Sequence, residues 1–193
     1  GLERNHGFDL EIAALIKNAF KLPQSTTNDF MYTCVGLGGL GITPMYEEHI
    51  VQNLNQMFRV LNSNDEAVKE ISKQELIEVA SKRIRGKEKV SFNTALRWLC
   101  KKDEDNLVRY CRGTWWTRIR DAIERASNKF SITVTPTICD EQVHLKLEYE
   151  GPSRLVHDIT MQNRDQLCAI MHELLGTSHF DRWCSLSFQG SII

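Results

Sequence analysis

Residues 130–149 read FSITVTPTICDEQVHLKLEY, and this stretch decides the fold class. Apolar and polar residues alternate from Phe130 to Val134 and again from Val143 to Tyr149. A period of two is typical of β-strands that bury one face, so we expect two strands facing a common core. The loop between them is expected to contain Pro136. The sequence therefore predicts a β-hairpin near residues 130–149.

Outside the hairpin, apolar residues recur every three to four positions, which is the spacing of amphipathic α-helices. Thr43 and Pro44 suit the start of one helix, because threonine caps helices and proline fits the first turn. Gly176 suits the end of the last helix. Aromatic and branched residues predict a short extended segment at 30–35. The fold class that follows is α+β and predominantly α-helical. The expected helices cover residues 8–22, 44–61, 66–85, 91–102, 106–126 and 164–175.

Charge is unevenly distributed along the chain. The 193 residues carry a net charge of −1, but residues 82–125 hold 13 lysines and arginines against 6 acids, a local charge of +7. The remaining residues hold 11 against 19. A clustered basic segment is the usual electrostatic feature of a protein that binds a polyanion. We therefore expect nucleic acid to contact this segment, mostly through backbone phosphates.

Ten cations and one tryptophan of this segment are the candidate nucleic-acid-binding residues. For each cation taken singly, the alternative is a solvated helix surface paired with acids. The tryptophan either stacks on a base or packs against the core, whereas Trp98 and Trp116 fit buried positions. The candidates are Lys82, Arg83, Arg85, Lys87, Lys89, Arg97, Arg109, Arg112, Trp115, Arg118 and Arg120.

A glycine-rich turn, with Gly36, Gly38, Gly39 and Gly41, precedes the helix expected at 44–61. Three of these glycines satisfy the GxGxxG pattern of dinucleotide-binding folds. In those folds the third glycine lies inside the helix, and an acid follows about 20 residues later on a second strand. This sequence provides neither feature. A nucleotide- or dinucleotide-binding enzyme that uses the Gly36–Gly41 turn is one alternative; the simpler interpretation is that the glycines permit positive φ.

A resemblance rests on residues 12–42. An amphipathic helix is followed there by Leu22–Pro23, a polar step at Ser25–Thr27, an aromatic segment at Phe30–Tyr32, and Gly38–Gly39–Leu40–Gly41–Ile42. This order resembles the thumb of non-LTR (LINE-like) retrotransposon reverse transcriptases, closest to the site-specific elements with a restriction-like endonuclease. Residues 113–125 (GTWWTRIRDAIER) resemble that family's post-thumb tryptophan/arginine helix, and residues 179–190 (HFDRWCSLSFQG) resemble its short helix and Gln-Gly step.

The resemblance implies a thumb-like helical region at residues 1–89 and a post-thumb linker module at residues 90–193. It implies a fragment of a longer polyprotein that follows the polymerase palm and grips the RNA/DNA primer–template hybrid. The parent family is an RNA-directed DNA polymerase, but the Asp-Asp pair of its palm occurs nowhere here, so we expect no catalytic residue in this chain. No cofactor is expected either. A structural or interaction remnant that binds nothing is the other alternative.

Cysteine and histidine usage does not predict a metal site. Cys168, His172, His179 and Cys184 lack the familiar spacing of zinc ligands, so the expectation is a buried Cys168 and a surface histidine. The six cysteines contain no CxxC pair and indicate a reduced, intracellular compartment, nucleus or cytoplasm. No apolar run approaches the ~20 residues that a membrane helix needs, so no membrane partner is expected.

Overall fold

The computed structural model describes residues 2–84, 89–100 and 113–189, and the candidates Arg85, Lys87, Arg109 and Arg112 lie outside these ranges. The described chain is predominantly helical with one small antiparallel sheet, which confirms the α+β class. Its elements are α1 (Leu2–Ala19), α2 (Asn28–Tyr32), the 3₁₀ turn η1 (Val35–Leu37), α3 (Met45–Leu61), α4 (Glu66–Ser81), α5 (Phe92–Cys100), α6 (Trp115–Phe130), β1 (Ile132–Cys139), β2 (Gln142–Tyr149), β3 (Leu155–Ile159), η2 (Arg164–Gln166) and α7 (Leu167–Gln189).

The sheet has the order β1-β2-β3, and both pairs of neighbours are antiparallel. The predicted hairpin is confirmed, but Pro136 lies within β1, opposite Leu145, and not in the loop. Proline is tolerated there because β1 is an edge strand, where a missing N–H breaks no central ladder. The tight turn instead uses Asp140 and Glu141, with φ of 49° and 61°. The third strand, β3, was not predicted.

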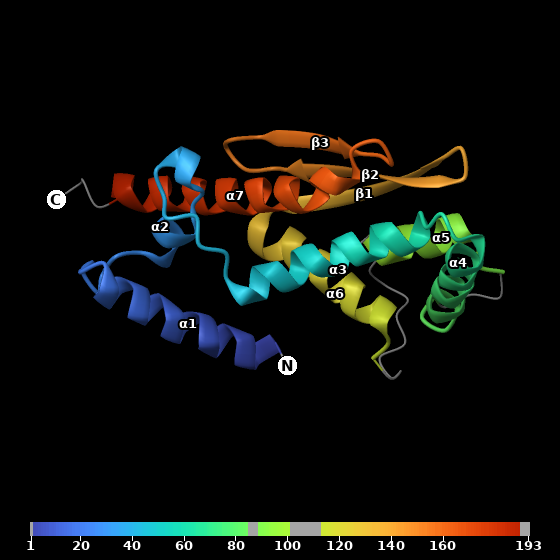
Figure 1. The fold of residues 1–193 in the computed structure, drawn as a ribbon, viewed down its shortest axis with the longest axis horizontal. Coiled ribbons are helices and arrows are strands. Elements are labelled where there is room, and N and C mark those ends of the chain that lie inside the picture. Colours follow the sequence, from blue (N-terminus) through green and yellow to red (C-terminus); the bar gives the residue numbers. More distant parts are fainter. Residues whose placement is uncertain (1, 85–88, 101–112, 190–193) are drawn as a thin grey trace.

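A single hydrophobic cluster connects the sheet to the helices that pack on it. Alternate residues of β2, from Val143 to Tyr149, are buried against the helical layer. Phe58 of α3, Leu76 of α4 and Trp116 of α6 belong to the same cluster. The cluster therefore contains residues from both sides of position 89, the expected boundary between the thumb-like region and the linker module. Figure 1 shows α7 running beside the sheet, with α1 on the opposite side of the molecule.

The start of α3 is capped from a distance. The helix begins one residue later than predicted, and its N-cap Pro44 provides no side-chain hydrogen bond. Asp9 of α1 replaces it: its carboxylate accepts from the backbone N–H of Met45 at 2.9 Å and of Tyr46 at 3.1 Å. These amides would otherwise lack an intrahelical partner. The cap also fixes α1 against α3.

Two further expectations about secondary structure were wrong. The segment at 30–35 is not extended: Thr27 caps the short helix α2 by accepting from Asp29 N, and η1 follows. No neighbouring strand is described that could pair with this segment. Gly176 does not end the last helix, since α7 continues through it to Gln189. A Cβ at position 176 would lie 3.3 Å from Cys34 Cβ, so this glycine allows the η1 region to approach α7 closely.

Candidate nucleic-acid interface

The glycine turn uses its own N–H groups internally. Gly38 N donates to Val35 O, Gly39 N to Cys34 O and Gly41 N to Thr33 O. The intervening Leu40 N and the following Ile42 N also donate to carbonyls of the preceding segment. A loop that cradles a pyrophosphate must direct free N–H groups at the ligand. These amides are therefore committed to folding the turn on itself.

The turn explains its glycines without a ligand. A Cβ on Gly39 would lie 2.2 Å from Thr33 O, which is a severe clash, whereas Gly38 and Gly41 have φ of 89° and 65°. Gly36 has open space and no such requirement. The turn follows the helix α2 and not a strand, and both strand pairs of the described sheet are antiparallel. The parallel strand–turn–helix unit that dinucleotide binding depends on is not formed by these residues.

The predicted cations at the end of α4 and on α5 lie in different settings. Lys82 forms an ion pair with Glu78 one turn earlier, so its charge is locally compensated. Arg83 is half-buried just after α4 and contributes to the electrostatic field at Asp121 of α6. Lys89 and Arg97 are exposed, and neither forms an ion pair with any acid that the structure describes.

Helix α6 separates candidates that are close in sequence. Arg120 lies over the ring of Trp98 on α5, with 4.9 Å between its Cζ and the ring centroid. Arg118 is exposed on the side that faces α3, where its charge acts on His49. Two residues span about 200° around a helix, which is why the two guanidiniums diverge. Trp115 is half-buried, 4.6 Å from the Trp116 ring between centroids, and packs against the core edge.

The side of α6 that faces α3 carries a row of three cations, Arg118, Arg125 and Lys129, which we call the α6 row. Spacings of seven and four residues place them on one face of the helix, over about 16 Å. Arg118 and Lys129 are exposed and Arg125 is half-buried. None of the three has an ion pair within 4.0 Å among the described residues. Sequence reasoning missed two of the three: Arg125, although it lies in the basic segment, and Lys129, because the helix was expected to end at 126.

Tyr46 and His49 of α3 lie beside the α6 row. The Nζ of Lys129 is 4.5 Å from the centroid of the Tyr46 ring, and the Cζ of Arg125 is 5.9 Å from it. Burial lowers the pKa of His49 below its ordinary value, and the charges of Arg125 and Arg118 lower it further. Burial and the two arginine charges together favour the neutral form of His49.

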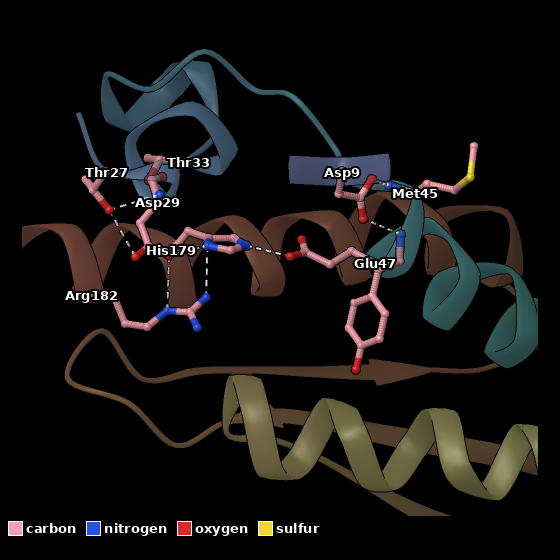
Figure 2. A network of polar contacts seen from close by, with 9 residues as sticks. Asp9, Thr27, Asp29, Thr33, Met45, Glu47, His179 and Arg182 are labelled. Atoms are coloured by element: carbon pink, nitrogen blue, oxygen red, sulfur yellow. Dashed lines mark hydrogen bonds and ion pairs between the residues drawn. The ribbon is translucent and has the colours of Figure 1, made fainter. Parts of the chain in front are cut away.

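A second polar site, which we call the His179 network, consists of Asp29, Glu47, His179 and Arg182. Figure 2 shows the imidazole of His179, on α7, between carboxylates from α2 and α3. Its Nδ1 is 2.6 Å from Asp29 Oδ1, and its Nε2 is 2.7 Å from Glu47 Oε1. Arg182 Nε lies 3.4 Å from the same Asp29 oxygen. His179 is 4% exposed, whereas His172 and Cys168 are half-buried, so the expectation of a buried Cys168 was wrong.

The pKa of His179 is shifted toward the protonated imidazole, while Arg182 Nη2 lies 2.8 Å from its Nδ1. Burial lowers the pKa of His179, but hydrogen bonds to Asp29 and Glu47, with the Glu47 charge, outweigh it and raise the pKa above its usual range. Burial acts in the opposite direction on Asp29, yet His179 and Arg182 hold its pKa below the ordinary value. Two carboxylates and two cations give a neutral set. The network therefore joins α2, α3 and α7 and leaves no excess charge to attract a ligand.

The remaining histidines, cysteines and acids of the described residues form no metal-ligand cluster. Among the described residues no three His, Cys, Asp or Glu side chains converge as metal ligands, and the described cysteines are free thiols. None of the described helices has the length and apolar character to span a bilayer. Comparison with protein-family models, curated proteins and solved structures finds no match to this chain.

Proposed function

We propose that this chain binds the sugar–phosphate backbone of a nucleic acid duplex, as the segment of a retrotransposon-type reverse transcriptase that follows the polymerase palm. In that role it holds an RNA/DNA primer–template hybrid inside the cell and performs no chemistry of its own. The observation that carries the proposal is the α6 row, with three cations on one helix face and no ion pair within 4.0 Å to an acid of the described chain; Asp121, one turn before Arg125, is the nearest acid in sequence on that side.

Lysine and arginine on a helix face suit a phosphate backbone as ligand. A polymerase must hold its substrate whatever the sequence, so phosphates are the suitable contacts. The exposed Lys89 and Arg97 add cations from α5 and the segment before it. The glycine turn supports neither a nucleotide nor a dinucleotide ligand, because its amides bond internally. The parent family and its compartment are carried by the resemblance described above.

The test is the salt dependence of binding by the full chain. Fluorescence anisotropy with a labelled RNA–DNA hybrid gives the Kd at several salt concentrations. Three phosphate contacts predict a slope of about −2.7 in log K against log salt, or about a 40-fold loss from about 50 to about 200 mM. The Arg118→Gln, Arg125→Gln, Lys129→Gln triple variant should lose most of this slope.

A matched variant removes three cations that are already paired with acids. Lys82 is paired with Glu78, and Lys146 and Arg154 are both paired with Glu148. Changing these three to Gln alters the net charge by the same amount and should leave the slope almost unchanged. Absence of hybrid binding by the wild-type chain, or binding that is independent of salt, would refute the proposed function.

A further inference from the structure

A cleft lies where α3 ends and α4 begins, beside η2, and no residue of α6 lines it. Its volume is about 360 Å³. Phe58 and Met161 provide apolar lining, and Arg59 of α3 and Arg164 of η2 line it as well. The loop between α3 and α4 supplies polar groups. The cleft is therefore separate from the α6 row and has its own cations.

The loop that lines the cleft is held at both of its ends. Asn62 is 5% exposed; its Nδ2 donates to Val143 O and its Oδ1 accepts from Val143 N, both at 2.8 Å. Asp65 Oδ1 accepts from two N–H groups in the first turn of α4. Between them, Asn64 is exposed, and its side-chain amide forms no hydrogen bond within the described chain. The cleft thus has a fixed polar wall that carries a free amide donor.

Two guanidinium groups converge on one carboxylate oxygen at this cleft. Arg59 Nη2 and Arg164 Nε each lie 3.9 Å from Asp165 Oδ1. Both distances exceed those of N–H···O hydrogen bonds, which end at about 3.2 Å. The side chain of Asp165 is 81% exposed, and ion pairs between exposed groups contribute little to stability. A ligand that binds both guanidiniums directly can therefore displace this carboxylate at little cost.

The neighbouring helices and acids do not account for Arg164. Arg59 lies in the last turn of α3, where a cation complements the helix dipole. Arg164 instead lies just before α7, at the positive end of that helix, where a cation is unfavourable. Of the nearby acids on the α4 side, Asp65 is engaged by the amides of α4, and Glu66 pairs with Lys69 at 3.4 Å. The two guanidiniums share one exposed carboxylate.

We propose that this cleft binds the phosphate group of a nucleotide unit, which Arg59 and Arg164 contact directly while Asp165 moves into solvent. Guanidinium forks match phosphate oxygens and form bidentate, charge-assisted hydrogen bonds. The amide of Asn64 is a further donor, and the volume lies within the range of about 300–1,000 Å³ typical of small-ligand pockets. The phosphate belongs either to a free nucleotide or to the backbone of a bound nucleic acid. Only the second source rests on the proposed function.

Titration of the full chain with three small probes tests the first source. Adenosine 5′-monophosphate and inorganic phosphate should shift the ¹H–¹⁵N NMR resonances of residues 62–65 and of arginine Nε–H groups. Adenosine lacks the phosphate and should shift neither set. Equal shifts with adenosine would show recognition of the base and would overturn the inference.

Three substitutions in the cleft give effects of opposite sign. Arg59→Gln and Arg164→Gln should each weaken phosphate binding by about tenfold, the usual effect of losing a charge-assisted hydrogen bond. Asp165→Asn should strengthen binding, because it removes the charge that competes with the phosphate. A merely structural role of Asp165 would not raise affinity. Arg154→Gln is the matched control, since Arg154 is paired with Glu148 outside the cleft. Circular dichroism checks that each variant is folded.

The RNA–DNA hybrid tests the second source by fluorescence anisotropy. A backbone phosphate in the cleft predicts that the Arg59→Gln, Arg164→Gln double variant binds the hybrid more weakly, even where adenosine 5′-monophosphate does not bind. The inference is overturned if this double variant binds both probes as wild type does, or if Asp165→Asn fails to strengthen binding. The proposed function then stands where the α6 triple variant still loses the salt dependence. A wild-type chain that binds the mononucleotide but not the hybrid would refute the proposed function and support the cleft.

Discussion

His179, which contacts Glu47 of α3, and His49, two residues further along α3, lie in opposite electrostatic surroundings. His179 reaches Glu47 from α7 and is enclosed by two carboxylates and Arg182. The charges of Arg118 and Arg125 of α6 act on His49, which forms no ion pair within 4.0 Å among the described residues. The first two turns of α3 therefore separate a neutral, buried network from a positively charged surface.

The comparison shows how one residue type serves two purposes. In the His179 network every charge has a partner of opposite sign, and the gain is a fixed arrangement of α2, α3 and α7. At His49 the missing counter-charge costs some stability, because like charges repel. Uncompensated charge near a surface persists most simply where a ligand supplies the opposite sign. Substitution of each histidine should therefore change stability to a different extent.

The largest expected effect is that of replacing His179. His179→Leu leaves Glu47 and Asp29 without the cation between them, and breaking a buried ion pair costs about 3–5 kcal/mol. Glu47 is 4% exposed, so water cannot take the place of the imidazole. Urea unfolding followed by circular dichroism measures the loss in the free energy of unfolding.

His49→Leu is the matched substitution and should change the free energy of unfolding by about 0.5 kcal/mol or less, since its charge is not part of a buried pair. Equal losses for the two variants would remove the contrast between them. A Glu47→Leu, His179→Leu double variant should lose less than the sum of the single variants, because each single variant strands a charge.

The second-largest expected effect is that of Gly39→Ala, which tests whether close packing of the glycine turn holds Asp29 of the His179 network in position. Gly39→Ala places a methyl group 2.2 Å from Thr33 O, and such overpacking costs about 1–3 kcal/mol. The strain is expected to displace α2 and, with it, Asp29. Thermal unfolding of the variant should show a lower Tm, and the His179 NMR titration should move toward the ordinary histidine pKa.

Gly36→Ala is the control within the same turn, because a Cβ at Gly36 has nothing within 4 Å. It should change the free energy of unfolding by no more than about 0.5 kcal/mol. A Gly39→Ala variant as stable as Gly36→Ala would mean that the turn relaxes freely, and that it does not hold Asp29 in place.

The sequence predicts periodic elements well and long-range partners poorly. The alternation from Val143 to Tyr149 and the apolar spacing of 44–61 have their causes within a few residues, so β2 and α3 could be recognised. The helix through Gly176 could not, because the reason for that glycine is Cys34, which lies on a distant turn. Likewise, the strand β3 has its apolar residues only partly buried and shows no clear alternation of burial.

The candidate site was likewise predictable only in its local features. A charge of +7 in residues 82–125 indicated an interface without showing which cations share a face. Helical geometry then placed Arg118 and Arg120 on different sides of α6 and brought Lys129 into line with Arg118. The His179 network joins partners 150 and 132 positions apart, and no spacing in a single sequence carries that information.

The smallest expected effect is a difference of sign in the pH dependence of stability. The pKa of His179 is raised in the folded chain, so its contribution is fully present below the unfolded value of about 6.5 and is lost as pH rises through the folded value. The pKa of His49 is lowered, so its contribution is present above about pH 6.5 and is lost as pH falls through the folded value. The free energy of unfolding of wild type minus that of His179→Gln should therefore decrease as pH rises. The free energy of unfolding of wild type minus that of His49→Gln should decrease as pH falls. Chemical denaturation at a series of pH values from about 5 to about 8.5 measures both differences. Parallel curves would show that the two imidazoles experience the same field, and the positive surface beside α6 would then have no support from His49.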